Sequence, residues 1–123
     1  AQALNYLGYS YAEMGTHLDE ALKYIKRAVA IRPGDAFIMD SLGWAYFKLK
    51  RYDEAVAALE EAISLVDDDS TIVEHLGDVF AARQYFKKAL KQYQRALILA
   101  PERKELIEKI QKLKGEQREQ VTK

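Results

Sequence analysis

The sequence of 123 residues contains no cysteine, only two prolines and six glycines. The absence of cysteine excludes disulfides and thiolate metal sites, and it leaves the redox compartment open. The scarcity of proline and glycine leaves long segments without the residues that most often interrupt helices. Basic and acidic residues number 19 each. Because these charges cancel, there is no general basic field, and we expect no nucleic-acid partner and no attraction to anionic membranes.

Long hydrophobic runs are absent as well. No apolar run approaches the roughly 18 residues of a membrane-spanning helix, so we expect no direct membrane insertion. Hydrophobic residues make up 49% of the chain and charged residues 31%, a balance typical of folded rather than disordered proteins. The chain is rich in strong helix formers and sustains no strand-like alternation, which predicts an all-α fold.

The sequence also offers few groups for catalysis or metal binding. His17 and His75 are far apart and have no cysteine companions, so we expect no metal site. The acidic run at residues 67–69 lacks the glycine and later glutamate of a calcium loop. No glycine-rich phosphate loop and no nucleophile with a suitably spaced base is present. We therefore predict that the protein is not an enzyme and binds no cofactor.

What the sequence does contain is an internal repeat. Three glycines recur at intervals of 35 and 34 residues, namely Gly8, Gly43 and Gly77. Alanines recur at intervals of 34 in two further registers, namely Ala21, Ala55, Ala89 and Ala28, Ala62, Ala96. One period shared by three registers indicates a stack of similar structural units.

Each unit also carries the same internal pattern of large and small residues. The first unit reads Leu4, Leu7, Gly8, Tyr11, Ala21, Ile25, Ala28 and Pro33. This pattern resembles the tetratricopeptide repeat, and the resemblance extends to about residue 101. The resemblance implies an antiparallel helix pair in each repeat and an α-solenoid, a right-handed superhelix, of three such pairs. Small residues allow the paired helices to approach closely, and large ones fill the space beside the crossing.

The periodicity predicts a single domain over residues 1–123, with repeats at about 1–35, 36–69 and 70–103. Helices are expected near residues 2–14, 18–31, 37–49, 53–66, 71–83 and 87–100, and Ser70 is expected to cap the fifth. A capping helix near 102–115 should cover the last repeat with Leu106, Ile107, Ile110 and Leu113, leaving Lys109 solvated. Gly115 is expected to end that helix, and residues 116–123 are expected to fray.

In tetratricopeptide proteins the first helix of each pair lines a concave groove, so the resemblance implies a partner-binding surface. The matching candidates are Asn5, Tyr9, Glu13, Phe37, Asp40, Trp44, Phe47, Glu74 and Asp78. Aromatic residues are common interface anchors. Packing between first helices is an equally open role for Phe37 and Phe47. Trp44 is expected to be exposed, because Gly43 and Tyr46 already define the packed face.

The charges of these candidates favour a particular partner. The four acids should attract lysine or arginine beside apolar side chains. Some family members instead hold a partner's terminal carboxylates with basic groove residues. Asn5 matches one such position, but Ser41, Thr71 and His75 occupy the others. We therefore expect no carboxylate-binding groove of that kind.

Two hypotheses for function follow. The first is a protein-interaction module or scaffold that binds a peptide or helix of a partner in the groove. The second is a structural self-association module, a homo-oligomer or part of a longer array, joined through the uncapped first repeat. The stretches at residues 4–9 and 40–44 look like those of bacterial repeat proteins, some of them attached to the cell envelope. The compartment, cytoplasm or envelope, stays open.

Overall fold

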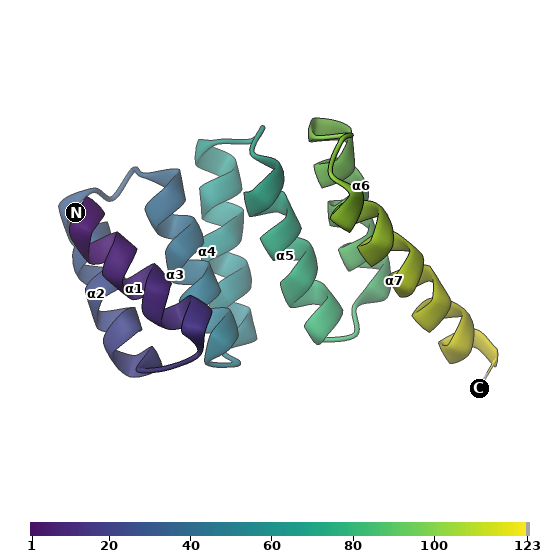
Figure 1. Ribbon diagram of the computed structural model, residues 1–123, viewed down its shortest axis with the longest axis horizontal. Coiled ribbons are helices and arrows are strands. Elements are labelled where there is room, and N and C mark those ends of the chain that lie inside the picture. The colour runs from purple at the N-terminus through teal and green to yellow at the C-terminus, as the bar shows by residue number, and fades with distance from the viewer. Residues whose placement is uncertain (123) are drawn as a thin grey trace. The chain divides into compact units, whose positions relative to one another are not determined.

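The computed structural model describes residues 1–122, and side chains as far as residue 117. Within this part of the chain all regular structure is helical (Figure 1). The helices are α1 (Gln2–Met14), α2 (Leu18–Ile31), α3 (Ala36–Lys48), α4 (Tyr52–Leu65), α5 (Ser70–Ala82), α6 (Phe86–Leu99) and α7 (Lys104–Thr122). The all-α prediction is confirmed, and the first six helices begin and end within one residue of their predicted bounds.

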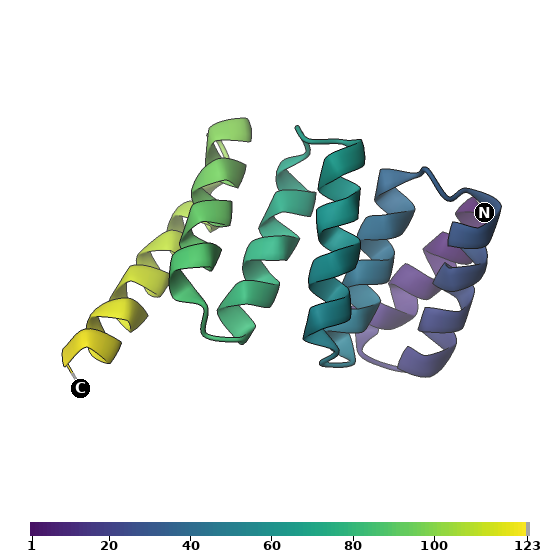
Figure 2. The same ribbon diagram turned by 180° about the vertical axis from the view of Figure 1, so that it is seen from behind.

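The chain forms two compact units, of which the first comprises residues 1–67 and the second begins at residue 68. The first unit contains the pairs α1–α2 and α3–α4, and both α1 and α2 pack against α3. Figure 2, seen from behind, shows α2 and α4 in front of α1 and α3. The second unit contains the pair α5–α6, with α7 packed on α6. That the three repeats make a single domain stays a prediction.

Close approach of the paired helices explains the period of 34 residues. A Cβ atom added to Gly43 would lie 2.6 Å from Leu59 Cγ, and one added to Gly77 would lie 2.7 Å from Tyr93 Cε1. A Cβ atom on Gly8 would lie 2.9 Å from the carbonyl oxygen of Ala21. The facing helices present fully buried alanines at these crossings: Ala21, Ala28, Ala55, Ala62, Ala89 and Ala96. The period of the sequence therefore marks the positions at which the backbones of paired helices come into close contact.

Aspartates cap the first helices of the second and third repeats. Asp35 accepts hydrogen bonds from the amides of Phe37 and Ile38, at 2.9 and 3.2 Å. Asp69 accepts one from the amide of Ile72 at 3.0 Å. The prediction that Ser70 caps this helix is wrong, because the longer carboxylate one residue earlier reaches the free amide. The Ser70 hydroxyl instead donates to the carbonyl oxygen of Ala96 at 3.0 Å.

Helix α7 is longer than predicted. It does not end at Gly115 but continues to Thr122. The predicted fraying of the last residues stays a prediction, and residue 123 lies outside the described residues. A glycine inside a helix costs only about 1 kcal/mol relative to alanine, and its neighbours Lys114 and Glu116 are good helix formers. Leu106, Ile110 and Leu113 are buried as predicted. Ile107 is 40% exposed and does not belong to that apolar face.

The glycine crossings lead to the first testable prediction. Gly43→Leu should lower the free energy of unfolding by at least about 1–3 kcal/mol, because the new side chain would overlap Leu59 and separate α3 from α4. Urea denaturation followed by circular dichroism measures this loss. The control is Gly115→Ala, whose Cβ would meet nothing within 4 Å and which should leave stability unchanged or slightly raised. Equal stability of the Gly43→Leu variant and the parent would contradict the close crossing.

Candidate functional site

The candidate residues of the first unit lie on two neighbouring helices. Asn5, Tyr9 and Glu13 are four residues apart, so they share one face of α1. Helix α1 packs against α3, which carries Asp40, Trp44 and Phe47. We call Asn5, Tyr9, Glu13, Trp44 and Phe47 the α1–α3 strip.

A side-chain hydrogen bond joins the two halves of this strip. The indole Nε1 of Trp44 donates to Glu13 Oε2 at 3.0 Å, and this bond is exposed. The Trp44 ring also lies 5.0 Å from the Phe47 ring, centroid to centroid, with the Lys48 ammonium 5.2 Å from its centre. Trp44 is therefore half-buried rather than exposed as predicted, because its indole links α1 to α3.

The hydroxyl of Tyr9 lies in the field of two carboxylates. Burial raises the pKa of Tyr9, and the charge of Glu13, a hydrogen bond to Glu13 and the charge of Asp40 raise it further. Asp40 itself is only 8% exposed, so the acid expected to face a partner is largely covered. Trp44 thus donates its polar hydrogen to Glu13, whose side chain remains exposed and whose charge acts on Tyr9.

Three further candidates differ in their surroundings. The Asn5 Oδ1 atom is buried and accepts no hydrogen bond from any described residue. Phe37, at the start of α3, is 55% exposed. Its two expected roles were contact with a partner and packing between first helices, and its exposure does not fit the packing role. Phe47 is half-buried between the rings of Trp44 and Tyr52. The α1–α3 strip thus combines aromatic surface with oxygen acceptors.

In the second unit, the candidate acids of α5 are held by cations of the α7 region. Arg103 Nη2 lies 2.6 Å from Glu74 Oε1. Lys109 Nζ lies 2.7 Å from Glu74 Oε2 and 2.9 Å from Asp78 Oδ1. Glu74 is only 6% exposed, and paired cations are what make a buried carboxylate tolerable. These acids therefore serve inside the second unit to hold α7 against α5.

A tyrosine completes this ionic cluster. The Tyr93 hydroxyl donates to Asp78 Oδ1 at 2.6 Å, and Lys109 Nζ lies 5.7 Å from the centre of the Tyr93 ring. Burial raises the pKa of Tyr93, and the negative charge of Asp78 and their hydrogen bond raise it further. Burial alone would raise the pKa of Glu74, but hydrogen bonds from Lys109 and Arg103 outweigh it and leave that pKa below its ordinary value.

The sequence interpretation missed the residues that neutralise these acids. Lys109 was expected to be solvated, and this was wrong, because it lies half-buried between two carboxylates and an aromatic ring. The signal was the period itself, since Lys109 follows the buried His75 by 34 residues. By the same step Leu106, Ile110 and Leu113 follow the buried residues Ile72, Leu76 and Val79. Helix α7 is thus equivalent to the first helix of a fourth repeat.

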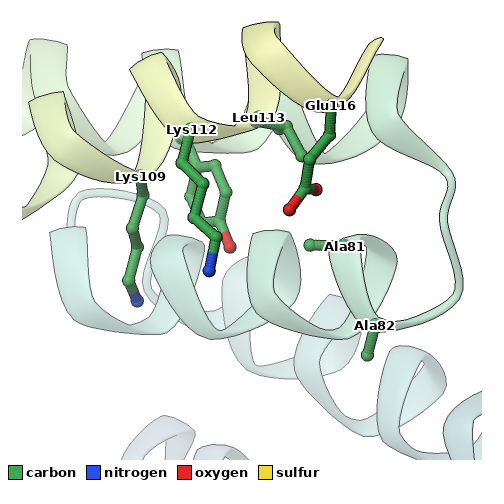
Figure 3. A pocket seen from close by; sticks show the side chains of 7 residues that line it. Ala81, Ala82, Lys109, Lys112, Leu113 and Glu116 are labelled. Carbon is green, nitrogen blue, oxygen red and sulfur yellow. The ribbon is translucent and has the colours of Figure 1, made fainter. Parts of the chain in front are cut away.

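Helices α5 and α7 also border a pocket of about 320 Å³ in the second unit. Figure 3 shows Lys109, Lys112 and Glu116 extending from α7 toward the α5 side, where Ala81 and Ala82 lie. The remaining lining residues are Tyr93 and Leu113. The hollow exists because two alanines stand where bulkier side chains could fill the space, and its rim carries both signs of charge.

No three histidine, cysteine or acidic side chains of the described residues cluster in a way that could hold a metal ion. No helix among those residues is long and apolar enough to cross a bilayer.

Comparison with known proteins agrees with this architecture of paired helices. A protein of Pseudomonas aeruginosa described as TPR repeat-containing is 42% identical over 48 residues, which are 39% of this chain and 8% of that protein. The first TPR of Spaghetti (RPAP3), solved with an HSP90 peptide, matches 93% of this chain and 90% of its own with a TM-score of 0.84 at 24% identity. A TPR protein from Thermus thermophilus matches 78% of this chain and 49% of its own, with a TM-score of 0.74 at 29% identity.

These features define a helical repeat protein built from paired helices. Two sequence models of the tetratricopeptide repeat match residues 1–68 and 41–104. The chain therefore belongs to the tetratricopeptide repeat family, and the predicted solenoid fold class is confirmed. The chain corresponds to a small part of the matched Pseudomonas aeruginosa protein.

The lowered pKa of Glu74 gives a second prediction. A carboxyl group whose pKa is lower when folded stabilises the fold above its unfolded pKa of about 4.5, and that contribution disappears as the pH falls through the folded value. The parent should therefore lose stability below about pH 4.5, and the fall should be shallower for Glu74→Gln. Denaturation curves over this pH range measure the difference. Glu60→Gln, on an exposed site of α4, is the control and should follow the parent.

Proposed function

We propose that the chain is a protein-interaction module whose α1–α3 strip binds a peptide or helix of a partner protein. One observation carries the proposal: Trp44, Tyr9 and Phe47 present partly exposed aromatic surface beside the exposed carboxylate of Glu13. Aromatic side chains with a polar hydrogen are frequent interface anchors, because one group offers both apolar area and a directional bond. The exposed ring of Phe37 extends this surface to the start of α3.

Structural relatives support a binding role at the level of the fold. The first TPR of Spaghetti (RPAP3) was solved with an HSP90 peptide, SRMEEVD, and the second human RPAP3 domain with an HSP70 peptide, SGPTIEEVD. Both peptides are acidic at their C-terminal ends. The α1–α3 strip carries Glu13, with Asp40 close by, so we expect it to select the opposite charge. The partner class is therefore a segment with basic and apolar side chains.

The third prediction tests the aromatic anchor. Peptides selected from a random phage-displayed library by the parent chain should bind Trp44→Ala more weakly by at least about 2 kcal/mol, the usual loss at an interface anchor. Calorimetry with the synthetic peptides gives this number. Ile98→Ala removes an equally apolar group, 79% exposed on α6, and should leave binding unchanged.

Because Trp44 is half-buried, its loss will also lower the melting temperature to some extent. Trp44→Phe separates the two effects, since it keeps an aromatic ring and removes only the indole N–H. Stable, folded Trp44 variants that bind every selected peptide as the parent does would show that the strip is not the binding surface.

Self-association is the second candidate function, favoured by one face of α1. Tyr6 is 73% exposed, whereas its equivalent Ser41, one repeat later, is only 4% exposed. Ala3 is likewise exposed, whereas its equivalent Ile38 is 2% exposed. The helix face that is buried on α3 is therefore exposed on α1. A second copy, or a neighbouring repeat of a longer chain, could cover it.

The fourth prediction addresses this open face. If this face joins two copies, sedimentation equilibrium should show a fraction of dimer that increases with protein concentration. Tyr6→Asp should weaken that dimer without lowering the melting temperature, since the side chain is already exposed. A strictly monomeric parent at high concentration would remove this candidate and leave the binding-module proposal in place.

A further inference from the structure

We propose that Glu13 is the anchoring carboxylate for a lysine side chain of the bound partner, whose ammonium group lies between Tyr9 and Trp44. This inference rests on the proposed function, because it names the chemistry of the partner at the α1–α3 strip. The chain contains two similar arrangements of an aromatic donor and a carboxylate, one with its cation and one without.

The complete arrangement is in the second unit. A buried aromatic side chain, Tyr93, donates to one oxygen of Asp78 at 2.6 Å. The Lys109 ammonium lies 2.9 Å from the same oxygen and 5.7 Å from the centre of the donor's ring. The aromatic donor thus orients the carboxylate, and the ammonium binds both the negative oxygen and the face of the ring.

The incomplete arrangement is in the first unit. Trp44 Nε1 donates to Glu13 Oε2 at 3.0 Å, and the Tyr9 hydroxyl lies in the field of the same carboxylate. The carboxylate is thus oriented by an aromatic donor of α3 and has an aromatic hydroxyl of α1 beside it. No cation of the described residues forms an ion pair with Glu13, which remains exposed. The first unit therefore has the aromatic donor and the carboxylate, and among the described residues it lacks an ammonium paired with that carboxylate.

The rings beside Glu13 are suited to a lysine. Lys48 already lies 5.2 Å from the centre of the Trp44 ring, which shows that this indole attracts an ammonium group. A partner lysine could place its carbon chain along the exposed aromatic surface and its charge at Glu13. The match to Lys109 favours lysine over arginine, because the observed cation is a single ammonium rather than a planar fork.

A second acceptor lies on the same face of α1. The Asn5 Oδ1 atom is buried without a hydrogen bond from any described residue, and Asn5 stands one helical turn before Tyr9. Because this oxygen is covered, it can contribute a polar surrounding to the α1 face but does not itself contact the partner.

The experiment is a double-mutant cycle between the chain and peptides selected from a random phage-displayed library on the parent. We expect the selected peptides to contain lysine next to apolar residues. Glu13→Gln keeps an oxygen that can accept from Trp44 and removes the charge, and it should weaken binding about tenfold or more. Replacing the peptide's lysine by methionine should cost a similar factor in the parent and almost nothing in Glu13→Gln.

Controls make the result specific to this carboxylate and to an ammonium. Glu60→Gln removes the same charge from an exposed position on α4 and should not change affinity. Acetylation of the peptide's lysine should weaken binding as methionine does, and arginine should bind less tightly than lysine. Glu13→Lys should be rescued in part by a peptide with glutamate in place of lysine.

The outcomes separate this inference from the proposed function. Peptides that depend on Trp44 but bind Glu13→Gln and Glu60→Gln equally well would overturn the lysine anchor and leave the binding module intact. Additive losses in the cycle would do the same, because Glu13 would then act without touching the lysine. A library that yields no peptide dependent on Trp44 would overturn both proposals.

Discussion

The close crossing of two helices at a glycine is the constraint on which each repeat depends. At Gly43 there is no room for even a methyl group beside Leu59, and the alanines of the facing helix are fully buried. Such a crossing fixes the distance between the helices and therefore which residues around it must be large. Each other position of the repeat either packs around this crossing or is free to vary. Only residues at the free positions can determine which partner binds.

Charge satisfaction is the second constraint, and it divides the candidate acids into two groups. Glu74 is paired with Arg103 and Lys109, and Asp78 with Lys109, so removing both acids would leave the half-buried ammonium of Lys109 without these ion pairs. Glu13 is oriented by the indole of Trp44 and keeps its charge exposed. Similar acids on equivalent helices thus have different roles. In the second unit they stabilise the fold through ion pairs, and in the first unit we propose that the exposed carboxylate is available to a partner.

The sequence predicted the first six helices to within one residue because the period and the positions of glycine and alanine all depend on the same local geometry. It did not predict that α7 passes Gly115, because a single helix-breaking residue is a weak signal when its neighbours favour the helix. The exposure of Trp44 was misjudged because its hydrogen bond to Glu13 joins residues 31 positions apart. Lys109 was missed because the period was not extended past the third repeat, and no local pattern distinguishes a buried lysine from a solvated one.

The three repeats also act as internal controls for one another. The glycine position is the same in all of them because packing dictates it, whereas the next position is Tyr9, Trp44 and Asp78 in turn. Packing at the crossing cannot explain this variation, since the crossing is shared. Trp44 and Asp78 each take part in a hydrogen bond between an aromatic group and a carboxylate, and Tyr9 lies in the field of the Glu13 carboxylate. In the second unit this bond belongs to an internal ionic cluster, whereas in the first unit the carboxylate is exposed, so the same position of the repeat serves packing in one unit and lies at the surface in the other.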